Sequence, residues 1–417
     1  MIKQIGFILL TAIFAVNINN VKADDVTISG RQILVNGSPY VIKGICYNPV
    51  PKGSASRSFS NLTEDLALMT EAGINTIRVY SPITNVSVLD QIDAAGIKVI
   101  ISFGYNQGGY YDILSGTFIN YVNAYKDHDA ILLWELGNEY NYHPEWFNNN
   151  IQNWYTALNN AAEVIHNNDP SHPAATAHGD LPDANARSLC PNVDVWGMNV
   201  YRWDNPEGIF SEWSAVSSKP MYLSEAGADR YMTTAQSGYA QGENEEAQAD
   251  ATTNILDDIF RFPDICSGVT LFAFVDEWWK AGNYNTQDVG GFSFSVPYDN
   301  EANEEYWGIV DIDRNKTMAF DVVKAKYNSI IIGIEDQITD NTTIIYPNPV
   351  KEQLNLYGIN KGCRKVEIID LFGKSQISFS DIDVSLLSKN VETLPKGMYF
   401  LKISYNNNYQ VLRFIKM

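Results

Sequence analysis

The stretch LLWELGNEYN at residues 132–141 decides the fold, because a strand-forming apolar run ends there in a cluster of polar side chains. A short apolar run with this composition predicts a buried strand. Glu139 and its neighbour Asn138 stand at the exit of that strand. A carboxylate in such a position needs partners, so the rest of the chain must be searched for a second one.

Seven further strand-like runs accompany this one between about residue 40 and residue 330. Short β-rich runs alternate there with helical stretches, which indicates a parallel sheet with crossover helices. The eight runs are residues 41–47, 75–80, 98–104, 131–139, 174–179, 193–201, 221–227 and 268–279. Eight such units predict an α/β fold, a (β/α)₈ TIM barrel, followed by a small all-β, sandwich-like C-terminal module.

Residues typical of helix N-termini and C-termini stand at the ends of the predicted helices. Asn61 is expected to cap a helix with Glu64 three residues on, and Gly73 suits the position just after that helix. Gly96 repeats the same device before the next strand. Ahead of the barrel, Asn36-Gly37 predicts a hairpin turn, and we expect this hairpin to close the barrel floor.

The chain divides into four predicted parts. Residues 1–23 have a positive start at Lys3, an apolar core at residues 5–16 and a small residue, Ala23, before the expected cleavage point, as in a secretory signal peptide. A buried N-terminal helix is the alternative. The barrel domain, with its short hairpin, is predicted at 24–332, a linker at 333–345 and the C-terminal module at 346–417. We expect no membrane span in the mature protein.

The charge and composition of the chain limit the kinds of molecule that it is expected to bind. The formal net charge is −20, which argues against nucleic acid and polyanionic substrates and favours a neutral substrate. The four cysteines are scattered without a CxxC motif, so their pairing stays open. The five histidines form no HExxH spacing. We therefore predict no metal and no cofactor, and we expect a monomer.

Reactive side chains stand at the ends of several predicted strands, where a barrel of this type builds its active site. They are Arg78 and Tyr80 on the second strand, Asn138 and Glu139 on the fourth, His178 on the fifth, Asn199 and Tyr201 on the sixth, Glu225 on the seventh, and Asp276, Glu277, Trp278 and Trp279 on the eighth. Tyr47 follows the first strand.

Glu139 and Glu225 are predicted to face each other across the barrel mouth. Two carboxylates on either side of an anomeric carbon are what glycoside hydrolysis requires. One must keep its proton for the leaving oxygen while the other stays ionised to attack. Arg78 beside Glu225 would keep that group charged, and Glu139, near aromatic surface, would hold its proton.

These motifs resemble the retaining (β/α)₈ glycoside hydrolases of clan A over about residues 30–330. The matching features are Asn138-Glu139, Glu225 in LSEAG, Arg78 in IRVY and Trp278. The resemblance implies that Glu139 is the acid/base and Glu225 the nucleophile. It also implies that Asn138 holds the 2-hydroxyl, that Arg78 and Tyr201 brace Glu225, and that Trp278 lies under the sugar. YVIKGICYNP and TIRVYSP are similar to the branches that act on β-1,3-glucans, including glucanosyltransferases.

Further residues are candidates with competing interpretations. His178, Tyr47 and Glu277 are expected to bind substrate, although Glu277 and Asp276 are equally suited to a structural role. Glu135 shares a strand face with Glu139 and is interpreted as a structural partner of Arg78. Strict alternation turns Asn138 outward, so its role requires a bulge near Gly137.

The C-terminal tail resembles the sorting domain of the type IX secretion system. The matching stretches are YPNPVKEQLNL, IIDLFGK, LPKGMYFLKI and the basic end RFIKM. The resemblance implies export through the periplasm by that machinery to the medium or the cell surface, with removal of the module. A sugar-binding β-sandwich is the alternative.

Taken together, the sequence predicts a secreted, retaining, endo-acting β-glycosidase, with β-1,3-glucan as the first choice of substrate. Glucanosyl transfer and hydrolysis of mannan or cellulose are alternatives within the enzyme class. A non-catalytic glycan-binding surface protein is the alternative outside it, since a fold does not fix a function.

Overall fold

A computed structural model describes residues 24–106, 110–330, 344–346, 348–357, 363–370, 374–380, 386–405 and 409–417. The predicted signal peptide and most of the predicted linker lie outside these residues. The chain divides into two compact units, one of Met1–Gly37 with Ile42–Lys324 and one of Ser38–Val41 with Ala325–Met417.

The first unit is built on a closed barrel of eight parallel strands, which confirms the predicted fold. In chain order the strands are β4 (Ile42–Cys46), β5 (Thr76–Val79), β6 (Lys98–Phe103), β7 (Ile131–Asn138), β8 (Ala174–Gly179), β9 (Val195–Asn199), β10 (Met221–Glu225) and β13 (Cys266–Leu271). The last strand ends at Leu271, well before the predicted end at residue 279. The apolar run after Leu271 is buried but is not part of the strand.

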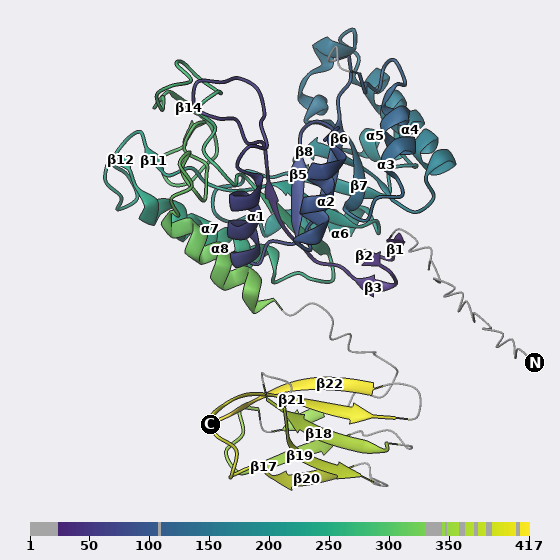
Figure 1. The fold of residues 1–417 in the computed structure, drawn as a ribbon, viewed down its shortest axis with the longest axis vertical. Helices are drawn as coiled ribbons and strands as arrows, with labels where there is room; N and C mark the ends of the chain where they lie inside the picture. Colours follow the sequence, from purple (N-terminus) through teal and green to yellow (C-terminus); the bar gives the residue numbers. More distant parts are fainter. Residues whose placement is uncertain are drawn as a thin grey trace, which may run out of the picture. The chain divides into compact units, whose positions relative to one another are not determined.

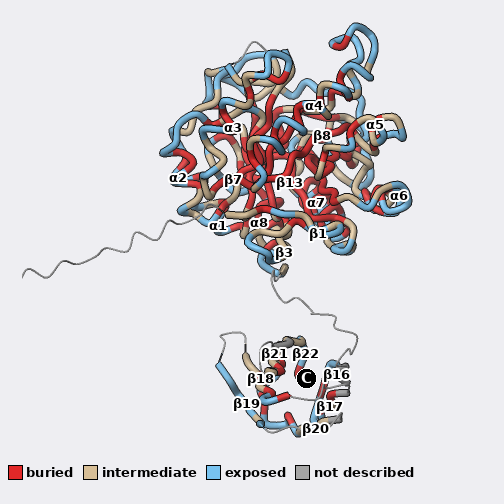
Figure 2. Tube along the Cα trace, turned by 90° about the vertical axis from the view of Figure 1, so that its right-hand side faces the viewer, coloured by how far each residue is buried: buried red, intermediate tan, exposed pale blue. Residues whose placement is uncertain are grey.

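Helices alternate with the strands and surround the barrel (Figure 1). They are α1 (Leu62–Glu71), α2 (Val86–Ala94), α3 (Phe118–Tyr125), α4 (Ile151–Asn168), α5 (Ala184–Leu189), α6 (Gly208–Val216), α7 (Glu245–Ile259) and α8 (Met318–Ser329). In α1 the buried apolar residues are Leu62, Leu66 and Met69, which form one apolar stripe along the helix. Figure 2 shows the buried segments gathered at the strands and the exposed ones on the outer turns.

The predicted helix ends are present, with one difference. Gly73 and Gly96 have φ values of 75° and 73°, as expected after a helix. Asn61 does begin α1, but its side chain makes no capping bond to the helix. Its Oδ1 instead accepts a hydrogen bond from Ser60 Oγ at 3.2 Å.

Short strands close the barrel at the end where the barrel strands begin. β1 (Val26–Ser29) pairs with β2 (Gln32–Val35), and the predicted turn at Asn36-Gly37 leads to β3 (Ser38–Pro39). The Val26 amide donates to Ser171 O, just before β8, and Ser267 Oγ on β13 donates to Arg31 O. This confirms that the hairpin lies against the barrel floor.

Two connections at the opposite end of the barrel carry small hairpins of their own. β11 (Tyr231–Met232) and β12 (Gly242–Glu243) follow β10, and β14 (Gly291–Ser293) and β15 (Glu301–Asn303) follow β13. Short 3₁₀ helices, η1 (Tyr140–Tyr142) and η2 (Pro144–Phe147), follow β7. Long loops at this end are where a barrel of this type varies its chemistry.

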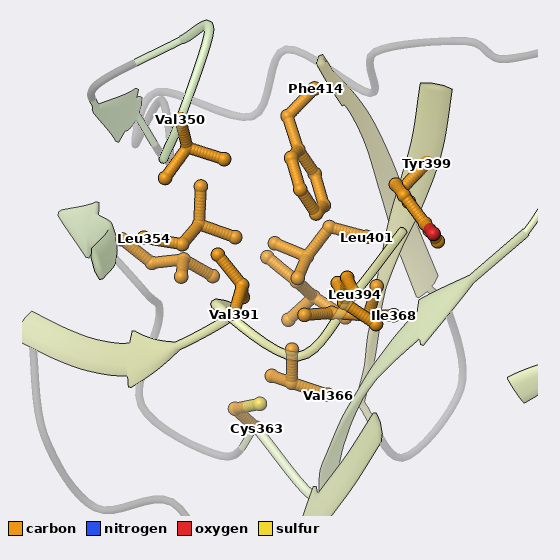
Figure 3. Close-up of a cluster of buried hydrophobic side chains, with 12 residues drawn as sticks. Val350, Leu354, Cys363, Val366, Ile368, Val391, Leu394, Tyr399, Leu401 and Phe414 are labelled. Atoms are coloured by element: carbon orange, nitrogen blue, oxygen red, sulfur yellow. The ribbon is translucent and has the colours of Figure 1, made fainter. Parts of the chain in front are cut away.

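The second unit has two antiparallel sheets. One has the order β16 (Ile344–Tyr346), β17 (Gln353–Tyr357), β20 (Leu386–Asn390), and the other β19 (Ser375–Ser380), β18 (Lys365–Ile369), β21 (Gly397–Ser404), β22 (Tyr409–Lys416). Alternate residues such as Val366, Ile368, Leu401 and Ile403 join one buried cluster (Figure 3). This period of two is what a sheet with one packed face requires.

Two properties of the whole chain bear on its environment. All four cysteines, Cys46, Cys190, Cys266 and Cys363, are buried and unpaired. Within the described residues, none of the helices combines the length and apolarity needed to cross a bilayer.

We expect Gly268→Ala to destabilise the barrel where its first and last strands meet. Gly268 has a φ of 122°, and a Cβ there would lie 2.0 Å from Ile42 O on β4. Strain of this kind costs about 1–3 kcal/mol before any clash is counted, so the free energy of unfolding should fall by more than that of Gly96→Ala. Gly96 also has a positive φ but open space around it. Urea unfolding of the two variants would compare them; equal stabilities would contradict this account.

Candidate active site

The carboxyl ends of four barrel strands bring polar side chains together. β5 contributes Arg78, β7 ends at Asn138, β9 at Asn199 and β10 at Glu225. In the strand order of the barrel, β7 and β10 are separated by β8 and β9. The residues at the ends of β7 and β10 therefore face each other across part of the barrel mouth, and they are not diametrically opposite.

Arg78 is the centre of this group. Its side chain is completely buried, and its Nε donates to both carboxylate oxygens of Glu135 at 2.9 and 3.0 Å. Nη1 donates to Glu225 Oε1 at 2.8 Å, and Nη2 donates to Asn138 Oδ1 at 2.8 Å. Burial opposes the charge, but the carboxylates of Glu135 and Glu225 raise the pKa of Arg78 well above its usual value. The guanidinium thus joins residues from three strands through charge-assisted hydrogen bonds.

Glu135 lies deeper in the barrel and is a structural partner, as interpreted from its position four residues before Glu139. It is completely buried, and it accepts hydrogen bonds from Ser102 Oγ and Tyr222 OH at 2.5 Å each. Together with Arg78, these donors satisfy both of its oxygens. A fully paired buried carboxylate of this kind fixes geometry rather than offering itself to substrate.

A bulge at Gly137 turns Asn138 into the site. The pairing of β7 with β8 shifts between Leu136 and Asn138, and Gly137 has a φ of 74°. A Cβ at Gly137 would lie 2.6 Å from Trp154, so no larger residue fits. The bulge reverses the alternation that would have pointed Asn138 outward, and its Oδ1 accepts from Asn199 Nδ2 at 3.1 Å.

Glu225 is held by three donors from three strands or loops. In addition to Arg78, Tyr80 OH donates to its Oε1 at 2.9 Å and Tyr201 OH donates to its Oε2 at 3.0 Å. Burial, together with the nearby charge of Glu225, raises the pKa of both phenols well above the usual value, so they remain protonated donors. Only 8% of Glu225 is exposed.

Tyr80 and Asn199 also belong to the site, although the sequence indicates only that they stand at strand ends. Tyr80 lies two residues beyond Arg78, so strand alternation places both on the same face, and this was the available signal. Asn199 contacts Asn138, and its Oδ1 accepts from Ser224 Oγ at 2.7 Å.

Glu139 has the surroundings of a carboxyl that keeps its proton. Burial, followed by the negative charge of Glu225, raises the pKa of Glu139 to about 7. A hydrogen bond with Asn199 and the charge of Arg78 oppose this shift. Glu139 itself has a left-handed backbone conformation, with φ 55°, and its amide donates to Ala177 O at 2.8 Å.

The structure does not bring Tyr47 to the site. Its side chain is buried, its OH donates to Asp65 Oδ2 at 2.6 Å, and its ring packs against Phe274. The preceding residue, Cys46, points its Sγ into the barrel, 3.5 Å from Ser224 O. Alternation therefore directs Tyr47 toward helix α1, and its predicted role in substrate binding is wrong.

The structure also places His178 outside the site. Its ring is buried between Tyr155 on α4 and Trp196 on β9, with centroid distances of 6.5 and 6.0 Å. Its Nδ1 contacts the carbonyl oxygen of Gly179 at 3.0 Å, and burial lowers its pKa. His178 thus packs between sheet and helix as a neutral core residue, and its predicted contact with substrate is wrong.

The residues predicted at the end of the eighth strand lie on the loop beyond Leu271, where Asp276 and Glu277 have different partners. Asp276 forms a buried ion pair with Arg230, with distances of 2.6 and 2.5 Å, and is structural. Glu277 accepts from Asn48 Nδ2 at 3.3 Å and lies 3.2 Å from Lys280 Nζ. Lys280 in turn lies 4.3 Å above the ring of Phe272, the first residue after β13.

Trp278 lies beside Lys52 rather than beside Tyr201. Lys52 Nζ is 4.7 Å from the centroid of the half-buried Trp278 ring. The aromatic ring packed on Tyr201 belongs to Trp307, at 5.5 Å. No spacing pattern in the sequence singles out Trp307, which lies in a long connection after β13.

Across the described part of the chain, no group of three His, Cys, Asp or Glu side chains is arranged to hold a metal ion.

Comparison with known protein families assigns the C-terminal unit. Residues 344–417 match the secretion system C-terminal sorting domain. This confirms the prediction of a type IX sorting module, and it indicates a secreted or cell-surface protein.

The barrel is similar to fungal carbohydrate-active proteins at low identity. A probable beta-glucosidase, btgE, of Emericella nidulans is 22% identical over 286 residues, which cover 64% of this chain and 46% of that protein. The 1,3-beta-glucanosyltransferase gel2 of Aspergillus fumigatus is 24% identical over 341 residues, covering 70% of this chain and 66% of that protein. The chain thus spans about half the length of the first of these relatives.

Solved structures share the fold. A GH2 beta-galacturonidase from Eisenbergiella tayi bound to galacturonate has a TM-score of 0.55 and 23% identity, covering 74% of this chain and 54% of that chain. A Bacteroides uniformis beta-glucuronidase has a TM-score of 0.58 and 17% identity, covering 94% and 48%. At these identities the likeness establishes the barrel architecture alone.

We expect Arg78→Met to destabilise the protein strongly. It leaves Glu135 buried without its cation, and removing one member of a buried pair costs about 3–5 kcal/mol. Arg261→Met is the matched control, because Arg261 is 56% exposed where it pairs with Glu207, and an exposed pair contributes about 0–1 kcal/mol. Urea unfolding measures both; a loss for Arg78→Met no larger than that for Arg261→Met would refute the role of Arg78.

Proposed function

We propose that this protein is a secreted, retaining β-glycosidase that acts on a neutral β-linked glycan. The observation that carries the proposal is the pair Glu139 and Glu225, which lie at the ends of β7 and β10 in opposite environments. Glu139 is partly buried and has a pKa raised to about 7, whereas Glu225 is surrounded by three hydrogen-bond donors that stabilise its negative charge. Such a division of roles is what two-carboxylate glycosidases use.

In the first step Glu225 attacks the anomeric carbon and forms an ester bond to the sugar. The glycosidic C–O bond breaks, and the Glu139 carboxyl gives its proton to the departing oxygen. In the second step Glu139, now ionised, takes a proton from water, whose oxygen attacks the anomeric carbon and breaks the ester. Glu225 leaves as a carboxylate, and both groups return to their starting states.

Asn138 and the two tyrosines support this chemistry. Asn138 is positioned by Arg78 and Asn199, so its amide nitrogen is the group available to a sugar hydroxyl beside the anomeric carbon. Tyr80 and Tyr201 fix the two oxygens of Glu225 and thereby orient it for attack. Trp278 is proposed as a substrate contact at the rim.

The charges around the site favour a neutral sugar. Lys280 is a second cation near Glu225, in addition to Arg78, and it is already paired with Glu304 at 2.6 Å and with Glu277 at 3.2 Å. A uronate would have to compete with these two carboxylates. The similarity to gel2 supports β-1,3-glucan as the first substrate and glucanosyl transfer as the closest alternative. The uronidases with similar structures support only the fold.

The sorting domain completes the proposal. A protein that carries this module is directed to the cell surface or the medium. We propose that it passes through the periplasm and that the type IX machinery is its export partner. Outside the cell it would meet polymeric glycans, which suits an endo-acting enzyme.

Product analysis on laminarin, mannan and cellulose tests this function. In the same assay we expect the substitution Glu225→Gln to abolish turnover. The variant keeps the shape of the side chain but removes the nucleophile, so the rate should fall by at least about a thousandfold with the fold intact. Glu163→Gln, an exposed glutamate on α4, is the control and should retain full activity. Binding of a glycan without turnover by the unaltered protein would favour the glycan-binding alternative, and full activity in Glu225→Gln would refute the assignment.

The pKa of Glu139 predicts the basic limb of the pH profile. The first step needs the protonated carboxyl, and the protonated fraction falls as the pH rises through about 7. We therefore expect kcat/KM to decrease about tenfold per pH unit well above that midpoint. Glu139→Gln should lose this limb with an activated aryl glycoside, whose leaving group needs no proton. A flat profile from about pH 6 to about pH 9 in the unaltered protein would contradict the assignment of Glu139.

A further inference from the structure

The loop that follows Glu139 presents large aromatic side chains to solvent. Tyr142 on η1 is 55% exposed, and Trp146 on η2 is 53% exposed. On the same loop, Tyr140 and Phe147 are buried, so the loop has a packed underside and an open upper surface. Large exposed aromatic groups gathered in one place mark binding surfaces more often than scattered ones do.

The loop is fixed to the neighbouring strand rather than left free. Asn141 Nδ2 donates to Gly179 O at 3.1 Å, and the Gly179 amide donates to Asn141 Oδ1 at 2.8 Å. Gly179 also makes room for Tyr142, since a Cβ at this position would lie 2.1 Å from the Tyr142 ring. The backbone of β8 and the face of Tyr142 are therefore in direct contact, and the ring is held in one position.

Trp146 is supported from one side. Its ring stacks on His143 with a centroid distance of 3.9 Å and an interplanar angle of 7°. His143 Nδ1 lies 2.9 Å from Glu145 Oε1, and Tyr140 meets Trp146 edge-on at 5.5 Å. With one face covered by His143 and about half of the residue exposed, Trp146 offers its other face to a ligand.

This surface lies on the proton-donor side of the site. The Tyr142 amide donates to Glu139 O at 3.0 Å, and the charge of Glu139 contributes to raising the pKa of Tyr142 to about 12, after burial. The charge of His143 acts on Glu139 in the opposite direction. Since the leaving oxygen must lie beside Glu139, the sugar that it carries extends toward this loop.

We propose that Tyr142 and Trp146 form the subsite for the leaving-group sugar, and that this subsite also holds an acceptor sugar. The inference rests on the function proposed above. The apolar face of a pyranose stacks on a flat ring, and the phenol of Tyr142 supplies a polar tip for a hydroxyl. A sugar retained here after the first step lies next to Glu139, which removes its hydroxyl proton. That oxygen then attacks the anomeric carbon in place of water and breaks the ester to Glu225.

Binding measurements in the inactive Glu225→Gln protein test the subsite directly. The probes are laminarin oligosaccharides of increasing length, followed by calorimetry. We expect Trp146→Ala and Tyr142→Ala to weaken binding about three- to tenfold for oligosaccharides long enough to cross the cleavage point. The conservative change Trp146→Phe should restore most of the loss. Val216→Ala is the control, because it shortens a side chain of similar exposure at the last residue of α6.

Product ratios in the active protein give a second readout. We expect Trp146→Ala to lower the ratio of transfer products to hydrolysis products at a fixed acceptor concentration. Unchanged affinities and an unchanged ratio, in a protein that does hydrolyse the glycan, would overturn the subsite alone. Loss of affinity in Trp146→Ala without turnover in the unaltered protein would instead overturn the proposed function. Absence of binding by every oligosaccharide would overturn the subsite as well.

Discussion

The buried guanidinium of Arg78 is the interaction on which the site depends. It is completely buried, so its charge is tolerated only because Glu135 and Glu225 lie within hydrogen-bond distance. Through these contacts it joins its own strand, β5, to β7 and β10, which carry Glu135 and Glu225. The stability of the barrel interior and the orientation of the nucleophile are thus two results of one arrangement, and neither can be changed independently of the other.

Gly137 shapes the site in a different way, because it interrupts the regular alternation of side chains along β7. The bulge at this residue lets two consecutive side chains serve the site: Asn138 turns inward, and Glu139 adopts a left-handed conformation. That conformation starts the loop which carries Tyr142 and Trp146. A single residue without a side chain therefore sets the relation between the sugar-binding groups, the proton donor and the aromatic surface beyond it.

The sequence was sufficient for the barrel and for the central polar group, because alternation of strands and helices and strand-end position are local properties. Arg78, Glu135, Tyr201 and Glu225 meet as their positions indicated, and Asn138 joins them through the bulge at Gly137. The predictions for Tyr47 and His178 were wrong because nearness to a strand end does not say which face of the sheet a side chain occupies. For both residues, that face is the one turned toward the surrounding helices rather than toward the barrel interior. The end of the eighth strand was set too late, since the apolar run continues beyond Leu271 as buried loop. Trp307 is brought to Tyr201 by a long connection whose path no local pattern describes.

The four unpaired cysteines have a consequence for a protein that leaves the cell. Each thiol is buried, and burial raises the pKa of Cys46, Cys190 and Cys266 to about 12, so at neutral pH they are neither nucleophiles nor partners for exchange. Cohesion comes from apolar packing and internal ion pairs instead of cross-links. A change in the redox state of the surroundings therefore finds no cross-link among these four cysteines to break and, at neutral pH, no ionised thiol at Cys46, Cys190 or Cys266 to oxidise.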